Sequence, residues 1–200
     1  MNFEREASAL DRRSAVAALL DQRGDLLVVS GLGSPSYDVF AAGDHDGNFY
    51  LWGAMGGAAM MGLGLALAQR HRPVAVVTGD GEQLMALGAL ATIGTKAPSN
   101  LSIIVLDNGE YGETGGQPSH TARGVDLCAV ATAAGFASSM SIADVHDIPT
   151  LGAAIRQTSG GPRFVRLAIR PGSPPKTLPP RDGVFLKTRF RANLGLAITE

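Results

Sequence analysis

Apolar residues follow two alternating patterns along this chain. Short unbroken runs rich in Val, Ile and Leu alternate with longer segments in which apolar residues recur at helical spacing. The runs, typical of strands buried on both faces, lie at 25–30, 49–52, 74–78, 101–106, 137–140 and 163–169. The helical segments lie at 9–22, from Ser34 or Ser36 to Ala42, and at 58–69, 82–93, 125–134 and 144–157. Because strands and helices alternate, we expect an α/β fold, a three-layer, doubly wound and mostly parallel sheet.

The segment from Val74 to Tyr111 predicts a strand, a loop, a helix and a second strand. Strands joined in this way lie parallel as neighbours, connected by a right-handed crossover. Asp80 follows the first strand and Asn108 follows the second, so both side chains are expected at one edge of the sheet. Open α/β sheets bind ligands at that edge.

The residues at this edge suit a phosphorylated ligand and a metal ion. Gly79 and Gly81 allow a close approach of the backbone, and the helix after them offers N–H groups to a phosphate. The Asp80 carboxylate, the Asn108 amide oxygen and a nearby backbone carbonyl are oxygen ligands of the kind that Mg²⁺ takes alongside phosphates and water. We expect a metal-bridged diphosphate; an ordinary strand–helix–strand unit with chance glycines is the simpler alternative.

The composition changes at residue 171. Residues 1–170 are expected to form one domain, while 171–200 begin with a proline-rich linker, PGSPPKTLPPRDG, that does not suit a regular element. The tail after the linker mixes apolar and basic residues. It either docks on a partner subunit or frays.

Length and charge exclude several classes of function. The chain has 200 residues, 45% of them hydrophobic, which suits one α/β domain with a full core. A net charge of −1 offers no polycation to nucleic acid, and no apolar stretch is long enough to span a membrane. The single cysteine, Cys128, is expected to be a reduced core residue, and no signal peptide is visible, so a cytoplasmic protein is expected.

The sequence GDG, followed by 25 residues and then Asp107-Asn108, resembles the binding motif of thiamine-diphosphate-dependent enzymes. In that family the motif usually ends in two asparagines, and Asp107 departs from the pattern at the first of them. The resemblance implies thiamine diphosphate and Mg²⁺ as cofactors, with Asp80, Asn108 and the main-chain carbonyl of Glu110 as the metal ligands. The cofactor residues that it implies around this motif are Gly79, Asp80, Gly81, Glu82, Asn108, Glu110 and Tyr111.

The WGAMGGA stretch resembles a second signature of the same family, a turn that holds the aminopyrimidine ring of the cofactor. By that resemblance Gly53, Ala54 and Met55 contact the cofactor. Gly53 would offer its carbonyl to the amino group, and Met55 would lie between the two rings. A plain core methionine is the alternative for Met55.

A glycine-rich loop follows Tyr111 and carries two titratable candidates, Glu113 and His120. Either could transfer a proton or contact an anionic substrate, and either could equally be exposed and inert. Arg123 is a candidate contact for an anion. Earlier in the chain, Asp38 could face a substrate, although a solvated first helical turn is the commoner explanation.

The resemblance also implies a missing part. Enzymes of this family need a glutamate from a separate pyrimidine-binding domain, and this chain has room for one domain only. The glutamate would then come from a partner, an α-type pyrimidine-binding subunit, in a hetero-oligomer. Three segments, from Gly33, Asn48 and Leu106, resemble the sulfopyruvate and phosphonopyruvate decarboxylase group. The implied reaction is decarboxylation of a small-molecule 2-oxo acid that carries a second anion.

Three other functions stay open. The chain could bind thiamine diphosphate without turnover, in a structural or regulatory role, or belong to a lyase or ligase of the acetolactate synthase type. It could also be a nicotinamide-dependent oxidoreductase that uses Gly31 and Gly33. That function requires an acidic residue about 20 positions later, at the end of a second strand. Asp44 and Asp46 lie nearer and in a turn-rich loop.

Overall fold

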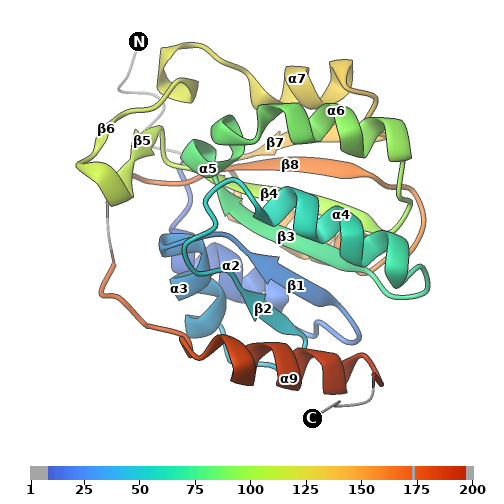
Figure 1. The fold of residues 1–200 in the computed structure, drawn as a ribbon. Helices are drawn as coiled ribbons and strands as arrows, with labels where there is room; N and C mark the ends of the chain where they lie inside the picture. Colours follow the sequence, from blue (N-terminus) through green and yellow to red (C-terminus); the bar gives the residue numbers. More distant parts are fainter. Residues whose placement is uncertain (1–8, 173, 197–200) are drawn as a thin grey trace.

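A computed structural model describes residues 9–172 and 174–196 and contains a six-stranded sheet (Figure 1). The strand order is β2-β1-β3-β4-β8-β7, and every neighbouring pair is parallel. The strands are β1 (Leu27–Ser30), β2 (Asn48–Tyr50), β3 (Val74–Gly79), β4 (Leu101–Asp107), β7 (Ser138–Ile142) and β8 (Arg163–Ala168). The predicted α/β fold with a parallel sheet is therefore confirmed.

Helices cover both faces of the sheet and complete three layers (Figure 1). The helices are α2 (Arg12–Leu20), α3 (Ser34–Ala41), α4 (Ala58–Ala68), α5 (Asp80–Met85), α6 (Leu87–Lys96), α7 (Leu127–Ala133), α8 (Ile148–Ile155) and α9 (Gly183–Asn193). Apolar residues of α2, α3 and α8 pack in one buried cluster, and those of α4, α6 and α7 pack in the other. In β3, Ala75 and Val77 join the first cluster while Val74 and Val76 join the second, because successive side chains of a strand point to opposite faces.

The sheet reverses its winding direction between β1 and β3. The chain runs from β1 outward to β2 and then returns to β3 on the other side of β1. The loops that follow β1 and β3 therefore lead to opposite faces and leave a crevice between them, which is the usual ligand position in open α/β sheets.

The predicted helix at 82–93 is wrong in one respect, because it consists of two helices with a break at Ala86. Ala86 leaves the helical conformation, with φ −107° and ψ 34°. The Gln83 side chain donates from Nε2 to the carbonyl of Ala86 at 3.3 Å. The same carbonyl accepts the N–H of Ala89 at 2.9 Å in the first turn of α6, so it has two donors at the break.

The C-terminal tail forms α9, which packs on β2 of the same chain (Figure 1). Asp182 caps the helix by accepting bonds from the backbone N–H groups of Val184 and Phe185. Leu186 and Phe190, one turn apart, are buried. A frayed tail is thus the wrong alternative for 183–193, while the described residues between 171 and 182 contain no helix or strand, as expected.

Two further expectations concern the whole chain. Within the described ranges, no helix is both long enough and apolar enough to cross a membrane. Cys128 is only half-buried, and its Sγ lies 3.3 Å from the carbonyl oxygen of Met140. The expectation of a core cysteine is therefore correct only in part.

Candidate functional site

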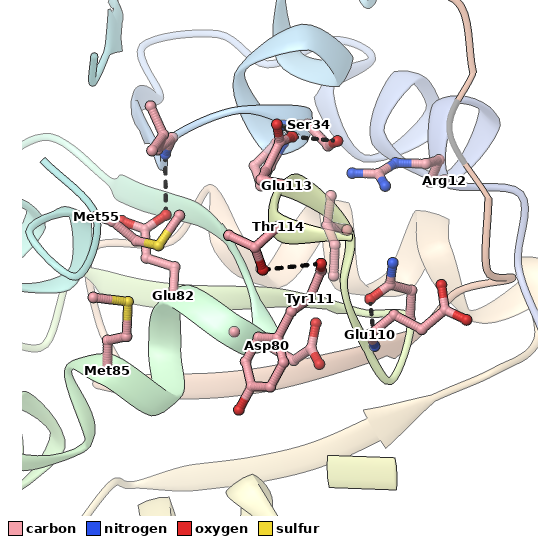
Figure 2. Close-up of a pocket in the computed structure, with 17 residues that line it drawn as sticks. Arg12, Ser34, Met55, Asp80, Glu82, Met85, Glu110, Tyr111, Glu113 and Thr114 are labelled. Atoms are coloured by element: carbon pink, nitrogen blue, oxygen red, sulfur yellow. Dashed lines mark hydrogen bonds between the residues drawn. The ribbon is translucent and has the colours of Figure 1, made fainter. Parts of the chain in front are cut away.

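A cavity of about 220 Å³ opens at the carboxyl edge of the sheet, between the loops that follow β1, β3 and β4 (Figure 2). It brings together most of the residues predicted from the sequence. The predicted residues that line it are Met55, Gly79, Asp80, Gly81, Glu82, Asn108, Glu110, Tyr111 and Glu113. Gly53, Ala54 and His120 are not among the described residues that line it.

Asp80 is buried at the floor of the cavity and is held by two hydroxyl groups. Its Oδ2 accepts hydrogen bonds from Ser119 Oγ at 2.5 Å and from Thr121 Oγ1 at 3.2 Å. Burial, together with the negative charge of Asp107, raises the pKa of Asp80 to about 6. Both hydroxyl groups bind the same oxygen, so Oδ1 is left without a hydroxyl partner and can bind a cation.

Asp107, the residue that departs from the family motif, is buried beside this network. It accepts bonds from Thr121 Oγ1 at 2.7 Å and from the Gly109 N–H at 3.0 Å, and it forms an ion pair with Arg166 on β8. Arg166 therefore balances the charge that the aspartate adds. Asp107 supports Asp80 through Thr121 and does not line the 220 Å³ cavity.

Asn108 and Glu110 lie on one side of the cavity, next to each other. Asn108 Oδ1 accepts the Glu110 N–H at 3.0 Å, which holds the side chain against its own loop. An amide oxygen has two lone pairs, so this bond leaves room for a metal ligand bond. In the described part of the chain, no group of three or more His, Cys, Asp or Glu residues is placed to hold a metal ion. A metal here would therefore need the mixed set of Asp80, Asn108 and the Glu110 carbonyl.

Glu82 lines the cavity but points its carboxylate at backbone groups. Its Oε2 accepts from the N–H of Leu32 at 3.0 Å, and its Oε1 accepts from that of Gly56 at 3.2 Å. Burial raises its pKa. A Cβ on Gly31 would come within 1.9 Å of Glu82 Oε2, so a larger residue there would displace this carboxylate. Glu82 thus ties the loop after β1 to the loop that carries Met55, a structural role that the motif did not reveal.

Glu113 places a carboxylate at the N-terminus of α3. Its Oε1 accepts from the Ser34 N–H and from Ser34 Oγ, both at 3.0 Å (Figure 2). The free N–H groups and the dipole of a helix N-terminus favour an anion at this position. The residue sits in a short 3₁₀ turn, Gly112–Thr114, between the strands of a small hairpin formed by β5 (Glu110–Tyr111) and β6 (Gln117–Pro118). The Glu113 carboxylate therefore occupies the anion position at the N-terminus of α3.

Arg12 also lines the cavity, although the sequence gave no reason to select it. Its Nε donates to Asp38 Oδ2 at 2.5 Å, and Arg13 Nε donates to Asp38 Oδ1 at 3.0 Å. Asp38 is fully buried between the two arginines, so the expectation of a solvated helical turn is wrong. The partners lie 25 and 26 positions apart along the chain, and no local pattern links residues at that separation.

Tyr111 and His120 form a pair at the rim. Tyr111 Oη and His120 Nδ1 are 2.5 Å apart, and the two rings meet edge to face. The Tyr111 ring lies over Gly81, where a Cβ would come within 2.9 Å of it. His120 is exposed and lies outside the cavity lining, and its contact with a cavity residue is the one with Tyr111.

Met55 lies on the opposite side of the cavity from Arg12 and Glu110 (Figure 2). It is half-buried, and its loop depends on glycines with positive φ, +73° at Gly53 and +91° at Gly56. Gly53 and Ala54 are exposed beside it. The Ala54 carbonyl accepts the N–H of Gly57 at 2.9 Å, which closes the turn beside Met55.

The residues of the cavity fit a metal-bound diphosphate. One end offers an anion position at the N-terminus of α3, which a carboxylate of the chain already fills. The same cavity holds the Asp80 carboxylate, with one oxygen not bound by a hydroxyl group, and the oxygens of Asn108 and Glu110. Oxygen ligands beside a phosphate position are the donor set that Mg²⁺ prefers.

The chain is similar in sequence to known proteins. The sequence model of the family described as "Thiamine pyrophosphate enzyme, C-terminal TPP binding domain" matches residues 40–167. The chain is 45% identical over 170 residues to phosphonopyruvate decarboxylase of Streptomyces viridochromogenes, covering 84% of this chain and 42% of that protein. It is 38% identical over 164 residues to the sulfopyruvate decarboxylase subunit beta of Methanothermobacter thermautotrophicus, covering 82% of this chain and 84% of that subunit.

The fold is also that of solved structures. A thiamine diphosphate-dependent 4-hydroxybenzoylformate decarboxylase of Rhodococcus jostii superposes with a TM-score of 0.66 at 23% identity. The match covers 82% of this chain and 33% of that enzyme. The chain thus spans about two fifths of the phosphonopyruvate decarboxylase that it matches and most of the sulfopyruvate decarboxylase beta subunit.

Proposed function

Because the chain belongs to the thiamine pyrophosphate enzymes, in the group of sulfopyruvate decarboxylase beta subunits and phosphonopyruvate decarboxylases, we propose that it is the diphosphate- and Mg²⁺-binding subunit of a 2-oxo acid decarboxylase. The observation that carries the proposal is the cavity that joins Asp80, Asn108 and Glu110 to the anion position at α3. The family match covers the first three of these residues.

In this proposal one end of the cavity binds the metal and the phosphates, and the other end orients the rings of the cofactor. Asp80, Asn108 and the carbonyl of Glu110 hold Mg²⁺, and Gly79 and Gly81 let the backbone approach the phosphates. Met55, with the carbonyl of Gly53 and with Ala54 beside it, orients the rings. Thiamine diphosphate, when bound, supplies the electron sink that allows a 2-oxo acid to lose CO₂.

The remaining titratable residues would act on the substrate and on protons. Glu113 is in the cavity and can hold a proton near the rings once it leaves Ser34. His120 contacts Tyr111 Oη, so a proton could pass between His120 and the cavity through that hydroxyl group. The Glu82 carboxylate keeps the two loops in register and does not take part in proton transfer.

A second chain would complete the site. The cavity of about 220 Å³ is smaller than the roughly 300–1,000 Å³ of typical small-molecule sites. Large apolar side chains are exposed on α4 and at the α5–α6 junction, and they include Met60, Met61, Met85, which lines the cavity, and Leu87. Exposed apolar surface of this kind usually marks a protein interface. A pyrimidine-binding, α-type subunit that brings the catalytic glutamate fits this surface.

The substrate proposed is a 2-oxo acid with a sulfonate or phosphonate group, after the relatives' names. Arg123 is exposed and does not line the 220 Å³ cavity, but it lines a neighbouring cavity together with Arg166. Contact of Arg123 with the second anion would therefore require the substrate to reach beyond the loop of Asn108. A half-buried, unpaired cysteine suits a reducing compartment such as the cytoplasm.

Calorimetric titration tests the proposal directly. Thiamine diphosphate with Mg²⁺ is titrated into this chain alone and into its mixture with an α-type subunit, and CO₂ release from sulfopyruvate and phosphonopyruvate is then measured. We expect tighter binding in the mixture and CO₂ release there only. Binding without CO₂ release from any 2-oxo acid would support a cofactor-binding module without turnover. Absence of binding in both samples would contradict the proposed function.

A further inference from the structure

The cavity contains a buried cation that the proposed metal and ring contacts do not use. Arg12 belongs to α2, ahead of the segment that the family model matches, and only 6% of its surface is exposed. Its Nε is bound to Asp38, and its guanidinium points toward Ser34 and the loop of Glu113 (Figure 2). Within residues 9–172 and 174–196, no hydrogen bond to its Nη1 or Nη2 is found.

A buried arginine rarely leaves both of its Nη groups without a hydrogen-bond acceptor. A guanidinium carries five N–H donors in a planar fork, and Nε supplies only one of them. Asp38 pairs the charge of Arg12, but buried polar groups normally have all their N–H donors hydrogen-bonded as well. Four donors of Arg12 therefore face a cavity in which an oxyanion with two acceptor oxygens would satisfy them.

The charges around the cavity also favour contact between Arg12 and a phosphate. Among the described residues that line it are the acidic side chains of Asp80, Glu82, Glu110 and Glu113, whereas Arg12 is its one basic side chain. A diphosphate placed among these carboxylates would be repelled unless cations offset them. Mg²⁺ offsets part of the charge, and a guanidinium that lines the same space offsets more.

The position of Arg12 indicates which end of the cofactor it would contact. Arg12 lies on the side of Glu110 and below Ser34, across the cavity from Met55 and Met85 (Figure 2). The methionine side is the one open to the rings in the proposed function. The opposite side combines the metal ligands with the anion position at the N-terminus of α3.

We propose that Arg12 binds the diphosphate of the cofactor as a forked hydrogen-bond donor, together with the Ser34 N–H from which Glu113 must withdraw. This inference rests on the proposed function, because it assigns a further ligand of the same site. Asp38 orients the guanidinium by holding Nε, so that the two Nη groups face the cavity. Arg13, the other partner of Asp38, turns its Nη groups to Thr177 and to the carbonyl of Pro175 and leaves the cavity free.

The test compares two arginines that share one aspartate. Binding of inorganic pyrophosphate with Mg²⁺ is measured calorimetrically for the wild-type chain, Arg12→Gln and Arg13→Gln. We expect Arg12→Gln to weaken binding by about ten- to a hundredfold, the size of one or two charge-assisted hydrogen bonds. Arg13→Gln is the matched control, because it also removes one partner of Asp38, and it should bind pyrophosphate as the wild type does.

A second variant covers the case in which Arg12→Gln does not fold. Arg12→Lys keeps the charge, but its single nitrogen cannot bind Asp38 and a phosphate in forked geometry, so a loss of affinity is again expected. Unchanged affinity in the Arg12 variants, or an equal loss in Arg13→Gln, would overturn the role of Arg12 and leave the proposed function intact. A wild-type chain with no affinity for pyrophosphate and Mg²⁺, either alone or mixed with an α-type subunit, would overturn both, because the anion position and the metal ligands all belong to this chain.

Discussion

Three buried carboxylates around the cavity are stabilised in three different ways. Asp107 has a cationic partner, Arg166, while Glu82 has backbone N–H groups and Asp80 has hydroxyl groups. Of these three, only Asp107 has a partner of opposite charge, as Asp38 also has beside Arg12. The site therefore keeps a negative charge on Asp80, where it can bind a cation. Burying this charge without a cationic partner lowers the stability of the folded chain.

The raised pKa of Asp80 gives a prediction for stability against pH. The folded chain holds the Asp80 proton more tightly than the unfolded chain, since its pKa is about 6 and the ordinary value is 3.8. The resulting stabilisation is present below about pH 4 and is lost as pH rises to about 6. Without metal, Asp80→Asn should be more stable than the wild type by about 2–3 kcal/mol at pH 7.5, with the difference vanishing near pH 4.

Urea unfolding at the two pH values, in EDTA, measures this difference. Mg²⁺ with pyrophosphate should then stabilise the wild type and leave Asp80→Asn unaffected, because the metal ligand is gone. A variant that is less stable than the wild type at pH 7.5 would contradict the assigned burial cost.

The position of Glu113 predicts that its carboxylate and a phosphate compete for the N-terminus of α3. An incoming phosphate must displace the carboxylate from Ser34, so its apparent affinity is lowered by the fraction of chains in which Glu113 is bound. Glu113→Gln should tighten pyrophosphate binding by roughly three- to tenfold. Glu110→Gln is the control, because it removes a negative charge from the same cavity without touching α3. An equal gain in both variants would show a general charge effect in place of competition.

At the residue scale, sequence alone could identify only part of the site. Asp80 and Asn108 follow adjacent strands, so strand topology predicts their proximity. Arg12 could not be found in this way, because its function depends on Asp38, which is 26 residues distant and was itself expected in solvent. Glu113 was selected as a titratable loop residue, but the contact with Ser34 spans 79 positions.

At the scale of elements, α4 shows how close packing and open surface meet on one helix. A Cβ on Gly62 would come within 2.2 Å of Val76 Cγ2, which belongs to the rigid, buried β3. A Cβ on Gly64, two positions later, would meet nothing within 4 Å. Gly62 is thus required for the close contact between α4 and β3, whereas Gly64 only weakens the helix.

These two glycines predict opposite effects of the same substitution. Gly62→Ala should destabilise the chain by about 1–3 kcal/mol through overpacking, whereas Gly64→Ala should stabilise it by about 0.5–1 kcal/mol through helix propensity. Thermal or urea unfolding of the isolated chain separates the two. Destabilisation by both substitutions would argue against the close contact between α4 and β3.

The elements themselves were largely predictable, for a physical reason. Strands buried on both faces are apolar at most positions, as in Val74–Gly79 and Leu101–Asp107, and such runs are visible in the sequence. The break at Ala86 depends on a side-chain bond from Gln83, which leaves no periodic signal. The helix α9 was missed because its apolar contacts are with β2, far away in the sequence.

At the scale of the whole molecule, the C-terminal helix closes one edge of the sheet. Phe190 packs edge to face on Phe49, with ring centroids 5.4 Å apart, and Arg189 pairs with Asp44. An exposed edge strand invites pairing with other chains, and a covering helix prevents it. We therefore regard α9 as part of the folded unit and not as a free tail.

Substitutions within α9 test this assignment. Phe190→Ala should cost about 2–4 kcal/mol, since a buried aromatic ring is lost. Phe185→Ala is the control, because that ring is about half exposed on the same helix and should cost well under 1 kcal/mol. The unfolding free energies of the two variants measure the difference, and similar small costs would indicate that α9 does not contribute to the fold.

Asp38 connects this C-terminal segment to the cavity. One of its oxygens holds Arg12, and the other holds Arg13, whose Nη groups bind Thr177 and the carbonyl of Pro175 in the segment that leads to α9. A ligand that binds the Nη groups of Arg12 and leaves Nε on Asp38 keeps this connection intact, so Arg13 holds the segment whether or not the cavity is filled. Amide hydrogen exchange near residue 177 should therefore be the same with and without pyrophosphate and Mg²⁺.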